Sequence, residues 1–288
     1  MSDLKDYAEK AYRILHKEGT SAETNYGRSK RIITSFFNSS EENYFETVIS
    51  RLTLIDSYYS TQINSKRLFG IDEIAEKIVH ISNQSDDELR MKCYKFLQSP
   101  LDSGGIKDLF EQEHYGIHKT GEPAGQASSL ISKYLYFLMS SNFPIYDTLA
   151  VSSYNKIKSK YNFDLPELKK EFDVSYFDSL KQLNILSKIE HFGKLDNLLW
   201  LVGKITQGSL SIIIDRDSYE KIAKRAKVVE KMASLKGQRG KKKKRKNGES
   251  PDGIIRDYIR NSQNLNEVFG GDEYLIEFFT FSMQFSDK

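Results

Sequence analysis

The chain has 288 residues, which is long enough for one large domain or two small ones. Its net charge is +3 and its mean hydropathy is −0.55. No run approaches the ~18 apolar residues of a membrane-spanning helix. The single cysteine, Cys93, excludes an internal disulfide, a multi-thiolate zinc site and a cysteine-held iron–sulfur cluster.

Helical periodicity dominates the sequence. We predict helices over 3–18, 40–59, 71–82, 86–98, 104–112, 126–140, 146–160, 165–171, 175–187, 194–206, 215–236, 251–260 and 271–282. Residues that favour helix starts stand at Ser40, Ser85 and Asp147. The best strand candidate, Ser211–Ile214, is short. The predicted fold class is therefore all-α.

The positive charge is concentrated late in the chain. Residues 221–246 hold 13 lysines and arginines and one glutamate, and 236–250 has the composition of a basic linker. The unbroken cationic run is Lys241, Lys242, Lys243, Lys244, Arg245 and Lys246. Such a run favours contact with a nucleic acid, and the alternative is a solvated loop that adds solubility.

Three short motifs occur in a particular order. The first, Tyr58-Tyr59-Ser60-Thr61-Gln62-Ile63-Asn64, closes an apolar helix. The second, Gly121-Glu122-Pro123-Ala124-Gly125-Gln126-Ala127-Ser128-Ser129, is a turn of small residues that opens a helix. The third, Phe143-Pro144-Ile145-Tyr146-Asp147, places a carboxylate just past a proline, after a buried segment. Burying an acid is costly unless it is paired or used, so Asp147 needs an explanation.

Together the motifs resemble the helix–hairpin–helix DNA glycosylase superfamily, which includes endonuclease III and the adenine-specific mismatch glycosylases. The resemblance covers roughly 45–160 and, more weakly, 195–204. It implies a two-lobed helical fold with a cleft for DNA between the lobes. The lobes would be 1–44 with 161–235, and 45–160 with the helix–hairpin–helix element, followed by the linker 236–250 and C-terminal helices over 251–288. The N-terminal helix would return to pack with the C-terminal helices.

The resemblance also implies a role for each motif. Asp147 would be the catalytic carboxylate that stabilises positive charge on the sugar during base removal. Gln62, with Asn64 beside it, would contact DNA where the flipped nucleotide leaves. Backbone amides at Gly125, Ala127 and Ser128 would anchor a phosphate. Candidates for stacking on the flipped base are Tyr58, Tyr59, Tyr146 and Trp200.

Bifunctional members of this family carry a nucleophilic lysine 18 residues before the catalytic aspartate. Here that position is Ser129, which predicts a monofunctional enzyme that leaves an abasic site without lyase activity. Lys133, one helical turn later on the same face, is either a displaced nucleophile or a surface or phosphate-binding lysine.

Other interpretations remain open at this stage. His114 and His118, with Glu111 or Glu113, would face one side of a helix and suggest a weak metal site. The chain could also be a non-catalytic DNA-binding or complex-forming helical protein. Our prediction is a cytoplasmic, nucleoid-associated monomer that binds double-stranded DNA without a cofactor or a membrane. It would remove a damaged, mispaired or modified base, for DNA repair or against modified phage DNA.

Overall fold

The structure is a computed structural model that describes residues 2–17, 24–39, 42–59, 61–100, 105–214, 216–237, 255, 258–260 and 265–286. The cationic run Lys241–Lys246 and the motif residue Ser60 lie outside the described residues. None of the described helices is long and apolar enough to cross a bilayer.

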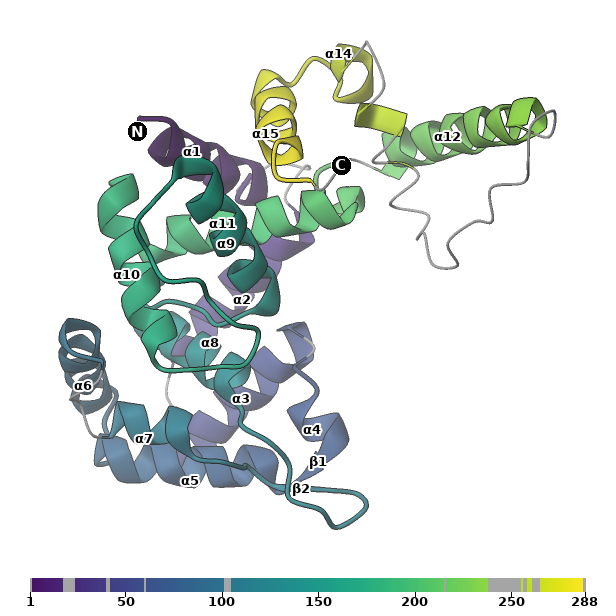
Figure 1. Ribbon diagram of the computed structural model, residues 1–288. Helices are drawn as coiled ribbons and strands as arrows, with labels where there is room; N and C mark the ends of the chain where they lie inside the picture. Colours follow the sequence, from purple (N-terminus) through teal and green to yellow (C-terminus); the bar gives the residue numbers. More distant parts are fainter. Residues whose placement is uncertain are drawn as a thin grey trace. The chain divides into compact units, whose positions relative to one another are not determined.

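Helices make up most of the described chain, and the all-α class is confirmed (Figure 1). The first half contains α1 (Ser2–Leu15), α2 (Asn25–Phe37), α3 (Tyr44–Tyr59), α4 (Ile63–Lys66), β1 (Arg67–Leu68), α5 (Gly70–Ser82), α6 (Asp86–Gln98), α7 (Ile106–Glu111), β2 (Ile117–His118) and α8 (Ser128–Leu138). The second half contains α9 (Thr148–Tyr161), α10 (Ser175–Ser187), α11 (Phe192–Gln207), the 3-10 helix η1 (Leu210–Ile212), α12 (Arg216–Gly237), α14 (Leu265–Val268) and α15 (Glu273–Met283). The two strands pair antiparallel, with Arg67 opposite His118.

Three predictions from the sequence are wrong. Helix α2 was not expected, although its buried residues Lys30, Ile33 and Phe37 have helical spacing. The predicted helix 165–171 is an irregular segment. The side chain of Asn155 holds it by bonding both the N–H and the C=O of Leu168. The predicted strand 211–214 begins with the 3-10 helix η1.

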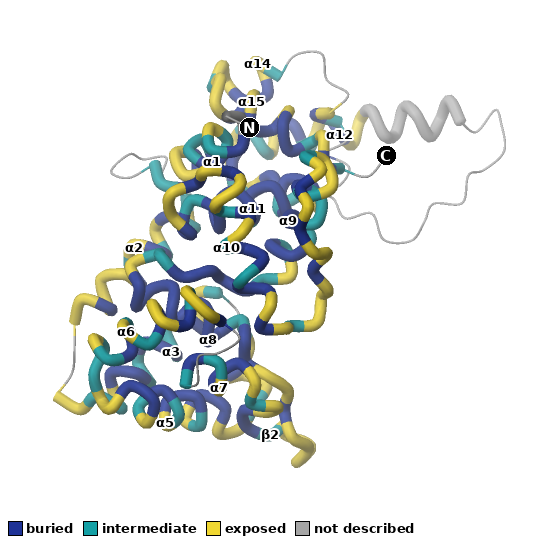
Figure 2. The backbone as a smooth tube through the Cα atoms, turned by 60° about the vertical axis from the view of Figure 1, so that its left-hand side comes forward, coloured by how far each residue is buried: buried dark blue, intermediate teal, exposed yellow. Residues whose placement is uncertain are grey.

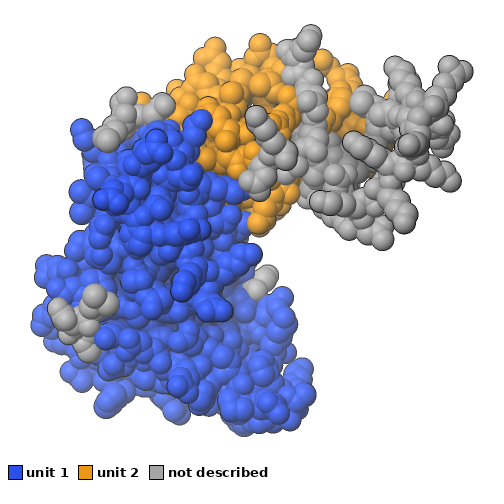
Figure 3. Space-filling view, in the orientation of Figure 1, with its two compact units in different colours: residues 1–5, 28–196 blue, residues 6–27, 197–288 orange. Residues whose placement is uncertain are grey.

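The chain divides into two compact units by its internal contacts. Unit 1 comprises residues 1–5 and 28–196, and unit 2 comprises 6–27 and 197–288 (Figure 3). The division falls within α1, within α2 and within α11. The lobe boundaries expected from the sequence stay a prediction.

The core of unit 1 is built around α8. Every residue of this helix except Ser129 is buried (Figure 2), because α8 contacts α3, α6 and α7. Beside it, five phenylalanines pack ring against ring, and they come from α6, α7, the segment before α9, the segment before α10 and α10 itself. They are Phe96, Phe110, Phe143, Phe172 and Phe177. Tyr146, just before the start of α9, packs edge-on against Phe172 of this cluster.

Two buried cations tie helices of unit 1 together. Arg51 of α3 pairs with Asp86 at 2.9 Å and also donates to the carbonyl oxygen of Ser39 at 3.0 Å. Lys30 of α2 contacts Tyr136 of α8 at 2.7 Å and Asp196 of α11 at 3.0 Å. Both cations have paired oxygens, which is how charged groups are accommodated in an interior.

In unit 2, α1 packs against α15, as the sequence predicts for the N-terminal helix. The ring of Tyr7 stacks on Phe281 at a centroid distance of 3.7 Å, and Lys10 forms an ion pair with Glu277. Helix α15 is capped by Asp272, whose side chain accepts the Leu275 N–H at 3.1 Å.

Candidate functional site

Gln62 lies in an exposed turn between α3 and α4. Its φ of 63° is in the left-handed region, and it is the N-cap residue of α4. The buried carboxylate of Asp56, in the last turns of α3, holds this turn. It accepts the N–H of Ile63 at 2.9 Å, the N–H of Asn64 at 3.0 Å and the hydroxyl of Thr61. Asp56 therefore fixes the backbone that presents Gln62 to solvent.

The turn of small residues is fastened by Arg67. Its guanidinium donates to the carbonyl oxygens of Tyr115, Gly125 and Gln126, far away in sequence. Nearby, Gly116 has a φ of 74°, and a side chain there would meet the carbonyl oxygen of Leu68 at 2.5 Å. Glycine is required at this position because the two strand segments approach so closely.

The backbone amides that open α8 have no acceptor. Within the described part of the chain, none of the five N–H groups from Gly125 to Ser129 reaches a hydrogen-bond acceptor. The N-cap residue, Ala127, has no side-chain acceptor to offer, and a side chain added at Gly125 would meet open space. The buried hydroxyl of Ser128 also finds no hydrogen-bond partner in the described part of the chain. Unpaired amides at a helix N-terminus favour an anion.

Asp147 is the N-cap residue of α9, as the sequence predicts. Its half-buried side chain accepts the N–H of Leu149 at 2.7 Å. One residue earlier, the N–H of Tyr146 donates to the hydroxyl of Ser132 at 2.9 Å. This bond joins the start of α9 to the second turn of α8, so the carboxylate is held close to that helix.

Lys133 is buried in α8, with 3% of its surface exposed. Its ammonium nitrogen donates to the hydroxyl of Ser129 at 2.5 Å and lies 5.4 Å from the ring centroid of Tyr59. Burial lowers the pKa of Lys133 below its usual value of 10.5, while the carboxylates of Asp147 and Asp196 act in the opposite direction.

The candidates for stacking on a base differ in their surroundings. Tyr58 is 44% exposed, and Tyr59 has a buried hydroxyl without a partner. Tyr146 is a core residue, since its hydroxyl donates to the carbonyl oxygen of Lys170 and its ring packs edge-on against neighbouring rings. Trp200 belongs to unit 2, where it stacks on Tyr26 at 4.3 Å. Unit 1 thus brings together Tyr59, Ser129, Lys133 and Asp147, and it does not include Trp200.

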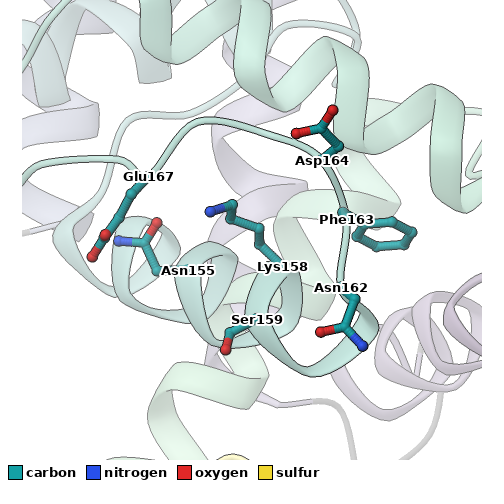
Figure 4. Close-up of a pocket in the computed structure, with 7 residues that line it drawn as sticks. All are labelled: Asn155, Lys158, Ser159, Asn162, Phe163, Asp164 and Glu167. Atoms are coloured by element: carbon teal, nitrogen blue, oxygen red, sulfur yellow. The ribbon is translucent and has the colours of Figure 1, made fainter.

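A pocket of about 510 Å³ lies elsewhere in unit 1, at the C-terminal end of α9. Polar side chains dominate its lining: Asn155, Lys158, Ser159, Asn162, Phe163, Asp164 and Glu167 (Figure 4). Lys158 in its lining is about 17 Å along the helix from Asp147, at 1.5 Å of rise per residue. This pocket is therefore separate from the carboxylate and lysine described above.

The proposed helical metal site is wrong in its geometry. Helix α7 ends at Glu111, His114 lies in a loop and His118 belongs to β2, so the histidines do not share a helix face. Among the described residues, no three potential histidine, cysteine or carboxylate ligands gather around one point.

Sequence reasoning missed three residues that organise the site: Asp56, Arg67 and Ser132. Asp56 accepts from donors five, seven and eight residues later, beyond the spacing of an ordinary N-cap. The roles of Arg67 and Ser132 depend on partners 58 and 14 residues away, which no local pattern reveals.

Compared with protein-family models, with curated proteins and with solved structures, the chain matches none.

Proposed function

We propose that this protein is a monofunctional DNA glycosylase with a helix–hairpin–helix type of fold. It hydrolyses the N-glycosidic bond of a damaged, mispaired or modified base in double-stranded DNA. The observation that carries the proposal is the meeting of two helix starts in unit 1. One presents the row of unpaired amides from Gly125 to Ser129, and the other presents the carboxylate of Asp147. The hydrogen bond between Ser132 and Tyr146 links the two.

This arrangement suits a phosphodiester chain with a reactive sugar. The unpaired amides offer donors and the positive end of the α8 dipole to a phosphate, without reading sequence. Gln62, held in its exposed turn by Asp56, supplies a side chain that can occupy the space left by a flipped nucleotide.

Asp147 supplies the chemistry. Breaking the bond from C1′ to the base nitrogen leaves positive charge on the sugar, and an adjacent carboxylate stabilises that charge. Water then adds its oxygen to C1′ and gives its proton to Asp147. The departing base keeps the bonding electron pair and takes up a proton, and Asp147 returns its own proton to solvent, so the products are a neutral free base and an abasic site.

The test exploits the capping role of Asp147. Asparagine caps a helix as well as aspartate does, so Asp147→Asn keeps the bond to Leu149 and removes only the charge. Short duplexes with uracil, hypoxanthine, 8-oxoguanine, 3-methyladenine or 5-hydroxymethylcytosine are incubated with each protein and then treated with alkali. We expect strand breaks with the wild type only after alkali, and a loss of about 100-fold or more in Asp147→Asn, with unchanged DNA affinity.

The matched control is Asp272→Asn. Asp272 is likewise an N-cap aspartate, at α15 of unit 2, so its variant reports the general effect of losing one capping charge. Base release by this variant should equal that of the wild type. Equal loss in both variants would contradict a catalytic role for Asp147.

A second candidate is a non-catalytic DNA-binding protein, which the hydrogen bond from Leu149 to Asp147 favours because it gives the carboxylate a structural role. Such a protein would bind DNA equally well after Asp147→Asn and would release no base. In both cases, replacing Lys241–Lys246 by alanine should weaken binding and flatten its salt dependence, because fewer counterions are released.

A further inference from the structure

Unit 1 contains two buried lysines in contrasting surroundings. Lys30, 4% exposed, has a carboxylate and a phenol within hydrogen-bond distance, which raise its pKa against the effect of burial. Lys133, 3% exposed, has as its hydrogen-bond acceptors among the described residues the hydroxyl and the carbonyl oxygen of Ser129, at 2.5 and 3.4 Å. No carboxylate of the described residues lies within 4 Å of it. A buried lysine with so little compensation is costly for stability, and such groups concentrate at functional sites.

The hydroxyl of Tyr59 is a second uncompensated group at the same place. It is buried and has no hydrogen-bond partner among the residues that the structure describes, whereas the hydroxyls of Tyr115 and Tyr176 donate to carbonyl oxygens. Burial, with smaller effects of nearby acidic groups, raises its pKa well above 10, so the phenol keeps its proton and remains a donor. The ammonium of Lys133 faces the ring of Tyr59.

The charged and titratable groups around Lys133 come from several elements. Tyr59 is on α3 and Asp147 is at the start of α9. From α11, Asp196 acts on Lys133 but is bonded to Lys30 of α2. The nearby carboxylate that remains without an ion pair among the described residues is therefore Asp147.

We propose that Lys133 is the proton donor to the departing base, and that the hydroxyl of Tyr59 hydrogen-bonds to that base. This inference rests on the proposed glycosylase function and adds a catalytic residue to it. The substrate class is a base that carries a hydrogen-bond acceptor and that leaves poorly as an anion.

The step balances without a further reactant. The bond from C1′ to the base nitrogen breaks, and its electron pair stays on the base, which takes a proton from the ammonium of Lys133. Water supplies the oxygen that bonds to C1′, and its proton passes to Asp147. Transfer of that proton through solvent back to Lys133 restores both groups. A lysine acid works best when its pKa lies closer to the working pH, and burial shifts Lys133 in that direction.

The experiment measures single-turnover base release against pH for the wild type, Lys133→Met and Lys133→Arg, on duplexes carrying the released base and a halogenated version of it. If Lys133 donates the proton, Lys133→Met is slower by about 100-fold or more and loses the fall in rate at alkaline pH. Lys133→Arg is equally slow, because arginine keeps the charge but does not release a proton. The loss is smaller on the halogenated base, which leaves more easily. The control is Lys160→Met, an exposed lysine on α9, which should behave as the wild type.

Several results would overturn the proposal. If Lys133→Met releases the base at the wild-type rate while Asp147→Asn is inactive, the glycosylase function is retained and Lys133 has no part in its mechanism. A covalent adduct between Lys133 and DNA, trapped with borohydride, would make the lysine a nucleophile instead. Absence of base release by the wild type on every duplex would refute the glycosylase and this inference together. If thermal melting shows that the variants do not fold, the pH profile of the wild type is the test. A wild-type rate of base release that does not fall at alkaline pH would overturn the proposal.

Discussion

Replacing Asp56 should destabilise the protein measurably, because this carboxylate satisfies three donors of the Gln62 turn. In Asp56→Ala, the buried N–H of Ile63 keeps no acceptor, which costs about 1–3 kcal/mol. The N–H of Asn64 and the hydroxyl of Thr61 are partly exposed and can turn to water, so each adds about 1 kcal/mol. We expect a total loss of about 3–5 kcal/mol in the free energy of unfolding.

Urea denaturation followed by circular dichroism measures this loss as a shift of the transition midpoint at constant slope. Asp56→Asn keeps one acceptor oxygen but turns an amide donor toward a backbone donor, so it should lose about 1–2 kcal/mol. The control is Ser57→Ala, whose exposed hydroxyl only bonds to Thr53 within the helix, with an effect below about 0.5 kcal/mol. An Asp56→Ala protein as stable as the control would refute the claim that this carboxylate holds the turn.

Three further results are expected. Asp147→Ala should lower the free energy of unfolding by about 1 kcal/mol, whereas Asp147→Asn should leave it nearly unchanged, as measured by urea titration. Cys93 is fully buried and burial raises its thiol pKa, so a thiol reagent at neutral pH should label it only when the protein opens, at a rate that rises steeply with urea. In the folded protein the pKa of Lys133 lies below its usual value of 10.5, so between these two pKa values the unfolded chain binds more protons than the folded one. The stability of the wild type therefore rises with pH in that range. Any gain in stability of Lys133→Met over the wild type should shrink as the pH rises toward 10.5.

Local signals in the sequence located much of the site. The apolar run that became α8, the proline at 144 and the aspartate after it predicted two helices with a capped start between them, and the structure has this arrangement. The rule behind this prediction is short-range, since Asp147 caps a helix whose first N–H groups lie two residues away.

The features that the sequence did not predict depend on partners that are distant in sequence. Helix α2 escaped prediction because Lys30 reads as a surface residue, and only its contacts with Tyr136 and Asp196 allow it to be buried. The segment 165–171 has apolar residues at helical spacing, but the backbone N–H and C=O of Leu168 bond to the side chain of Asn155 instead of to helical partners. The approach of Tyr59 to Lys133 likewise joins α3 to α8, and no pattern within either helix indicates it.

Arg67 has a consequence for how the surface attracts ligands. Its hydrogen bonds to the described residues go to carbonyl groups, and no carboxylate of the described chain lies within ion-pair distance of it. Its positive charge, on which the carboxylate of Asp56 also acts, lies at the loop that leads into α8, where the partial positive charge of the helix end adds to it. The folded body of unit 1 thus has its own local positive potential, independent of the lysine-rich stretch beyond α12. A protein stripped of that stretch should bind polyanions more weakly but still dock them at the same place.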